Sequence, residues 1–246
     1  MTADQTIRNK LYCAIDTPDA ARAEALAAGL AGAVGGIKLG LEFFAAHGPA
    51  GVRKVMDRAT GVDLFLDLKF HDIPNTVAAA MRAAVPLGPR LINVHAGGGR
   101  AMMAAAREAA REAADTAGCA APLVLGVTVL TSLDGEDLAS LGVGAAPEDQ
   151  VVRLASLAAE AGLDGVVCSA REITALRRAL GTDFILVTPG IRPAGAEAGD
   201  QKRVVTPAQA IRDGADFLVI GRPITGQPDP AAAARRIAAE AAETLA

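Results

Sequence analysis

Short apolar, β-branched segments recur along the chain, and alanine-rich segments with charged residues at helical spacing lie between them. The apolar segments are nearly continuous and do not alternate between polar and apolar residues, which is typical of parallel strands covered on both faces. We therefore predict eight parallel strands, at residues 11–15, 36–39, 62–68, 91–95, 123–129, 165–168, 184–187 and 217–220. Helices are predicted between them, most clearly at residues 18–30, 101–114 and 147–161, so the chain is a series of βα units.

Eight βα units in 246 residues predict a (β/α)8 TIM barrel, an α/β fold in which the whole chain, 1–246, forms a single domain. No linker rich in proline, glycine or serine and no run of like charges divides the chain. A doubly wound open sheet is the alternative fold. Its dinucleotide-binding version is disfavoured, because no GxGxxG motif follows the first predicted strand.

Composition limits the kinds of partner that the protein can have. The net charge of −4 offers no basic surface for nucleic acid or for an anionic membrane. Tryptophan is absent and there is one tyrosine, so stacking platforms for single-stranded nucleic acid are missing as well. The three cysteines form no CxxC pair, and neither a signal sequence nor an apolar stretch of membrane-spanning length is present. We expect a soluble cytoplasmic protein that acts on a small molecule, with no nucleic-acid or membrane partner.

The most informative segment is DLKFHDIPNT at residues 67–76, where an apolar strand gives way to a loop and Pro74 can begin a helix. Barrel enzymes carry their chemistry at this end of the strands. Asp67 and Lys69 are two residues apart and face the same side of the strand, and Asp72 follows in the loop. A lysine between two carboxylates keeps its charge, so Lys69 is a candidate proton donor and not a Schiff-base nucleophile. The alternative is structural: Asp67 and Lys69 form an ordinary salt bridge while Asp72 caps the next helix.

Polar residues follow most of the other predicted strands, as expected if they share one mouth of a barrel. Gly221-Arg222-Pro223 has the character of a phosphate site, because glycine allows close backbone approach and arginine can bind phosphate with two hydrogen bonds. The loop at residues 190–203 contains further cations and is a candidate lid. A solvated arginine, a simple surface loop and a salt bridge between Asp16 and Lys38 are the ordinary alternatives. The three histidines have no metal-ligand spacing, so we expect no metal site.

The chain resembles the orotidine 5'-phosphate decarboxylase family in a set of motifs: DLKFHDIPNT, KLG at the second strand, VHA at the fourth, LTS after the fifth, TPGIRP after the seventh and IGRPIT after the eighth. The resemblance runs nearly end to end, and Asp-x-Lys-x-x-Asp-Ile-Pro-x-Thr at a strand end is specific as a combination. It implies a barrel dimer that converts orotidine 5'-phosphate into uridine 5'-phosphate, the last step of pyrimidine nucleotide synthesis, without a cofactor or a metal ion.

The resemblance also implies roles for individual residues. Lys69 would deliver a proton to C6 of the pyrimidine as carbon dioxide leaves, and Asp67 would lie near the departing carboxylate. Asp72 and the ribose-binding Thr76 would come from the partner subunit of a homodimer with shared active sites. The other substrate-binding positions are Asp16 and Lys38 for the ribose, Thr131 and Ser132 for the pyrimidine, Pro189 at the start of the closing loop, and Arg192, Gln201, Gly221 and Arg222 for the phosphate. Whether Asp67 strains the substrate carboxylate or only holds Lys69 stays open at this point.

Two other functions compete with this interpretation. A sister group of barrels shares the Asp-x-Lys-x-x-Asp core but uses magnesium to act on sugar phosphates such as 3-keto-gulonate 6-phosphate, with a carboxylate from the second strand at the metal. Here that strand carries Lys38. The second alternative is a non-catalytic protein that binds nucleotide phosphates, and the intact proton donor Lys69 argues against it.

Overall fold

The computed structural model describes residues 3–193 and 205–243, and these contain a closed barrel of parallel strands. Each strand pairs with the next, and the last pairs with the first, so the described part of the barrel has no sheet edge. The strands are β1 (Leu11–Ile15), β2 (Gly36–Gly40), β3 (Asp63–Phe70), β4 (Leu91–His95), β5 (Leu123–Val127), β6 (Gly165–Val167), β7 (Ile185–Thr188) and β8 (Phe217–Ile220). The predicted (β/α)8 barrel is confirmed, and the doubly wound alternative is wrong.

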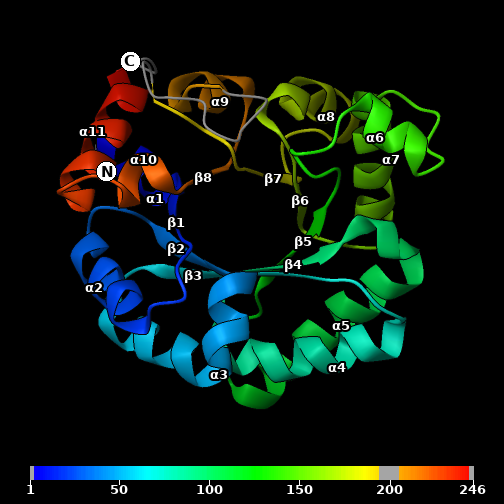
Figure 1. Cartoon of the computed structure of the whole chain (residues 1–246). Coiled ribbons are helices and arrows are strands. Elements are labelled where there is room, and N and C mark those ends of the chain that lie inside the picture. The colour runs from blue at the N-terminus through cyan, green and yellow to red at the C-terminus, as the bar shows by residue number, and fades with distance from the viewer. Residues whose placement is uncertain (1–2, 194–204, 244–246) are drawn as a thin grey trace.

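Helices surround the barrel on its outside, as the view along the axis shows (Figure 1). Those of the main ring are α2 (Ala20–Leu30), α3 (Leu41–Arg58), α4 (Pro74–Ala84), α5 (Gly99–Ala117), α7 (Pro147–Glu160), α8 (Ile173–Leu180), α9 (Pro207–Asp213) and α11 (Pro230–Glu243). Shorter elements are α1 (Ala3–Lys10), α6 (Gly135–Ser140), α10 (Arg222–Thr225) and the 3-10 turns η1 (Val85–Leu87), η2 (Ala96–Gly98) and η3 (Ala170–Glu172). No helix among the described residues is both long enough and apolar enough to cross a membrane.

The helices begin where the sequence supplies the appropriate residues. Proline occupies the first turn of α4, α7 and α9, where a backbone N–H has no partner within the helix, so its absence costs no intrahelical hydrogen bond. The side chains of Asp19, Asp134 and Thr206 accept backbone N–H groups at the starts of α2, α6 and α9. Alanine is abundant on the buried faces of α5 and α11, which lets both helices pack closely against the core, and α11 also packs against α1.

Alternation along the strands divides their side chains between two layers. One set points into the barrel and forms a core of its own, which includes Tyr12, Phe65, Leu91, Leu125 and Val219. The residues between them, such as Leu64, Leu66 and Ile92, pack outward against the helices. Since Phe65 and Leu91 face inward, Asp67 and Asn93, two positions further along, face inward as well and lie nearer the carboxyl ends of their strands.

The amino-terminal end of the barrel is closed by packing and by paired polar groups. The Tyr12 hydroxyl donates to Asp63 over 3.1 Å, and a side chain at Gly36 would lie 2.2 Å from the Tyr12 ring. Asp164 and Asp216 each accept a backbone N–H of a neighbouring strand and pair with an arginine. Among the described residues this end is filled, so the carboxyl ends of the strands are the expected place for a ligand.

Candidate active site

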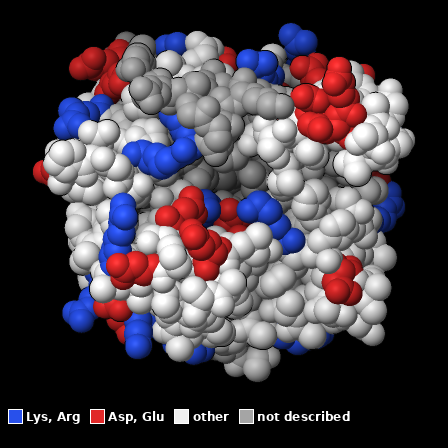
Figure 2. Space-filling model, viewed as in Figure 1, with Lys and Arg blue, Asp and Glu red and all other residues white. Residues whose placement is uncertain are grey.

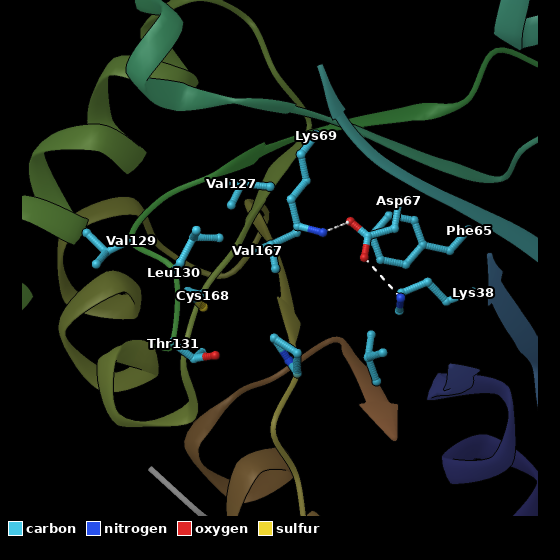
Figure 3. A pocket seen from close by; sticks show the side chains of 12 residues that line it. Lys38, Phe65, Asp67, Lys69, Val127, Val129, Leu130, Thr131, Val167 and Cys168 are labelled. Atoms are coloured by element: carbon cyan, nitrogen blue, oxygen red, sulfur yellow. Dashed lines mark hydrogen bonds and ion pairs between the residues drawn. The ribbon is translucent and has the colours of Figure 1, made fainter. Parts of the chain in front are cut away.

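A cleft opens at the carboxyl ends of the strands, in the centre of the face shown in Figure 2, and acidic and basic side chains gather at its rim. Its cavity volume is about 220 Å³, somewhat below the range of about 300–1,000 Å³ that is usual for small-molecule sites. Lys38, Asp67 and Lys69 form a charged side of the cleft, and Val127, Val129, Leu130 and Val167 form an apolar side (Figure 3). The arrangement suits a ligand with a flat apolar body and a charged substituent.

The charged side is a chain of alternating charges centred on Asp67. Its carboxylate accepts from Lys69 Nζ over 2.7 Å through Oδ1, and Lys38 Nζ lies 3.1 Å from Oδ2. Figure 3 shows the two lysines approaching this carboxylate from different sides. Lys38 Nζ also lies 3.2 Å from the exposed Asp16 carboxylate. The sequence predicted a lysine between two carboxylates, whereas within this chain a carboxylate lies between two lysines.

Burial and charge act in opposite directions on the pKa values of this cluster. Burial by itself would raise the pKa of Asp67, but Lys38, Lys69 and a hydrogen bond from Asn93 outweigh it and hold that pKa below its usual value. Burial would likewise lower the pKa of Lys38, and the carboxylates of Asp67 and Asp16 outweigh it and raise that pKa. At neutral pH both groups are therefore charged, and the buried charges are paired.

The backbone of Lys69 is irregular. Pairing between β3 and β4 shifts register between Leu66 and Phe70, and within that bulge Lys69 has a φ of 48°, the one positive φ of a non-glycine residue in the described chain. A conformation of this kind costs on the order of 1–3 kcal/mol and clusters at functional sites. The backbone N–H of Lys69 donates to the side chain of Asn93 over 2.7 Å. The strand continues through Lys69 to Phe70, two residues beyond the predicted end.

Asp72 and Thr76 do not reach the cleft of their own chain. Both are exposed, and Asp72 Oδ1 accepts the backbone N–H of Ile73 over 2.6 Å. Of the structural alternative, the salt bridge between Asp67 and Lys69 is present, but the cap by Asp72 is wrong, because the residue before α4 is Ile73 and no side chain caps that helix. The side chain of Ile73 is itself 67% exposed. Asp72, Ile73 and Thr76 thus form an exposed edge that directly follows β3.

The predicted phosphate-binding residues lie after β7 and β8. Arg192 is buried, and its pKa is lowered by burial and by the charge of Arg222, so two guanidinium groups influence one another here. Gly221 immediately precedes the short helix α10, and a side chain there would lie 3.4 Å from the Ala14 methyl group. Gln201 and most of the predicted lid lie outside the described residues. A pair of like charges at the mouth is an arrangement that a bound anion would relieve.

The remaining predicted positions divide between the cleft and its surroundings. Thr131 and Pro189 line the cleft, and Ser132 is exposed in the turn beside Thr131. Cys168 also lines the cleft, and its thiol is buried with a pKa raised chiefly by that burial. His95 stacks on His71 with ring centroids 5.2 Å apart. Asn93 is the contact that the sequence did not single out, although a lone amide in an apolar strand level with Asp67 was a usable signal.

Within residues 3–193 and 205–243, no group of three or more histidine, cysteine, aspartate or glutamate side chains is placed to hold a metal ion. The second-strand position that carries a carboxylate in the magnesium-dependent group is Lys38, and it is paired with Asp67.

Comparison with known proteins agrees with this geometry. The sequence model of the "Orotidine 5'-phosphate decarboxylase / HUMPS family" matches residues 9–237. The orotidine 5'-phosphate decarboxylase of Rhodospirillum rubrum is 60% identical over 240 residues, which span 98% of this chain and 97% of that protein. That of Moorella thermoacetica is 57% identical over 234 residues, spanning 95% and 92%. The crystal structure of orotidine 5'-phosphate decarboxylase from Lactobacillus acidophilus has a TM-score of 0.81 at 34% identity, covering 94% of this chain and 98% of that one.

Proposed function

The chain belongs to the orotidine 5'-phosphate decarboxylase / HUMPS family and converts orotidine 5'-phosphate into uridine 5'-phosphate in pyrimidine synthesis, and we propose that Lys69 supplies the proton that replaces the departing carbon dioxide. In this step the bond between C6 and the carboxylate breaks, its electron pair stays on C6, and the proton moves from Lys69 Nζ to C6. The observation that supports it is the 2.7 Å contact between Lys69 Nζ and Asp67 at the charged end of an otherwise apolar cleft.

Charge develops on C6 as carbon dioxide leaves, so the site has to stabilise a carbanion. A positioned ammonium does so without reorganisation, and the surrounding valines strengthen the effect by excluding water. We propose that Asp67 serves mainly to hold Lys69, since its own charge is already shared by two lysines within 3.1 Å. The proton donor is then fixed before the substrate arrives.

We also propose which residues around the cleft bind the other parts of the substrate. We assign the ribose to Asp16 and Lys38, the pyrimidine to Thr131, Ser132 and Pro189, and the phosphate to Arg192, Gln201, Gly221 and Arg222. The phosphate is remote from C6, so its binding energy assists the reaction only where it orders the site for the transition state. We also assign residues 1–246 to one barrel domain, and we propose that the reaction needs neither a cofactor nor a metal ion and takes place in the cytoplasm.

A shared site is proposed for a homodimer, in which Asp72 and Thr76 complete the cleft of the partner subunit. The support is their exposure beside Ile73, a large apolar residue that is 67% exposed at the same edge. The proposal is tested by mixing inactive Lys69→Ala protein with inactive Asp72→Ala protein. Mixed dimers should regain one intact site, whereas no recovery after confirmed subunit exchange would refute the sharing.

The decisive assay follows the loss of ultraviolet absorbance when chelator-treated protein meets orotidine 5'-phosphate. Turnover should be unaffected by the chelator, and Lys69→Ala should reduce kcat by roughly 10²- to 10⁴-fold, the usual range for the loss of a general acid. Lys54→Ala, an exposed lysine on α3, is the matched control and should behave as the wild type. A folded Lys69→Ala protein with normal kcat would refute the assignment of the proton donor. Loss of this turnover on treatment with the chelator would refute the proposal that the reaction needs no metal ion.

A further inference from the structure

Asn93, in the middle of β4, is a fully buried amide that contacts both members of the proposed catalytic pair. Its Nδ2 donates to Asp67 Oδ1 over 2.7 Å, and its Oδ1 accepts the backbone N–H of Lys69 over 2.7 Å. The orientation of the amide follows from its partners, because a carboxylate only accepts and a backbone N–H only donates. One side chain therefore holds the carboxylate that binds Lys69 and the backbone that carries Lys69.

The second of these bonds occurs where the sheet is irregular. Lys69 lies in the stretch where β3 and β4 change register, and its φ of 48° is one that residues other than glycine rarely adopt. Such a backbone persists only where its surroundings fix it. The Asn93 amide fixes it from the neighbouring strand, so the direction in which the Lys69 side chain leaves the backbone depends on this contact.

We propose that Asn93 is a positioning residue for the decarboxylation, which sets the place of Lys69 Nζ by holding Asp67 and the Lys69 backbone together. It has no exposed surface and does not touch the substrate, so it acts through these two residues. This inference rests on the proposed role of Lys69 as the proton donor. The positioning role explains why residue 93 is an amide, because this position requires a hydrogen-bond donor toward Asp67 and an acceptor for the backbone N–H of Lys69.

A positioning role predicts a kinetic pattern that a purely structural role does not. Asn93→Ala should lower kcat by roughly 100-fold, since small displacements of reacting groups have effects of that size, while KM should stay within about threefold of its wild-type value. The hydrogen bond from Asn93 stabilises the charged form of Asp67, so its removal should raise the pKa of that carboxyl and move the acid limb of kcat to higher pH.

Asn93→Asp separates the two hydrogen bonds, because it keeps the shape of the side chain and the acceptor for the Lys69 N–H. The introduced carboxyl group can donate to Asp67 only when it is protonated. The kcat of this variant should therefore rise as the pH is lowered, in a range where the wild-type kcat does not. Tyr12→Phe is the control for general loss of stability, since it removes a buried hydroxyl at the opposite end of the barrel.

The experiment compares kcat, KM, the pH profile and thermal unfolding for these three variants, with Lys69→Ala alongside. A folded Asn93 variant with wild-type kcat and pH profile would overturn the proposal. So would an equal fall of kcat in Tyr12→Phe, or loss of folding in both Asn93 variants, because Asn93 would then act only on stability. An active Lys69→Ala protein would instead refute the proposed function, whereas inactive Lys69→Ala with active Asn93 variants would refute only the positioning role.

Discussion

The left-handed backbone of Lys69 leads to an unusual prediction about stability. At most positions alanine is more stabilising than glycine, because glycine loses more conformational freedom on folding. At Lys69 the φ of 48° should reverse that order, since it penalises any side chain with a Cβ atom. Lys69→Gly should therefore be more stable than Lys69→Ala. Both variants lack the amine, so the lost ion pair with Asp67 cancels in the comparison.

The size of the difference follows from two opposing contributions. The left-handed conformation costs an L-residue about 1–2 kcal/mol, and the flexibility of glycine costs about 0.5–1 kcal/mol. Lys69→Gly should thus exceed Lys69→Ala by roughly 0.5–1 kcal/mol in free energy of unfolding. For a chain of this length that corresponds to a Tm higher by roughly 1–4 °C.

Urea unfolding and thermal unfolding of both variants measure this difference. The matched pair is Lys54→Gly and Lys54→Ala in α3, where the usual order should hold and glycine should be less stable by about 1 kcal/mol. If the two positions gave the same order, the strained conformation of Lys69 and the role we give Asn93 in fixing it would both lose their basis.

Three further predictions concern pH, packing and binding. The pKa of Asp67 is lowered on folding, so its contribution to stability is present above about pH 4 and is lost as the pH falls through the lower folded value. In measurements of the free energy of unfolding against pH, Asp67→Asn should therefore flatten the fall in stability on the acid side. Gly36→Ala places a methyl group against the Tyr12 ring and should destabilise by about 1–3 kcal/mol in urea unfolding, whereas Gly29→Ala, with open space around it in α2, should stabilise by about 0.5–1 kcal/mol. Arg192→Ala should raise KM roughly 10- to 100-fold in steady-state assays and weaken inhibition by inorganic phosphate, because it removes a charged hydrogen-bond donor.

The barrel could be predicted because parallel strands buried on both faces leave continuous apolar runs. Three strands, β1, β4 and β8, match their predicted bounds. The other strands differ from the prediction mainly at their carboxyl ends, near the cleft. The strand predicted at 123–129 ends at Val127, and β3 continues through its bulge to Phe70. These differences fall at the end of the barrel that forms the cleft, where function interrupts the apolar pattern.

The candidate site was predictable in its residue types but not in its connections. Alternation along a strand placed Asp67 and Lys69 on the same side, since this depends only on parity. The order of charges was not accessible, because the distance of Asp72 along the chain says nothing about the direction of its loop. The contact of Asn93 with Lys69 depends on register across two strands and on a local positive φ, neither of which a single sequence encodes in a readable form.

The charge balance of the cluster connects the stability of the fold with the proposed reaction. Buried ions are tolerated when they are paired and hydrogen-bonded, and the four residues Asp16, Lys38, Asp67 and Lys69 together are neutral. In the proposed reaction, a bound substrate carboxylate makes the array more negative by one charge. Carbon dioxide leaves as a neutral molecule, so this charge stays behind, first on C6 and then in the array itself, where Lys69 is neutral and Asp67 keeps its pairing with Lys38. In this proposal neutrality returns when Lys69 takes up a proton from water, and each turnover consumes one proton.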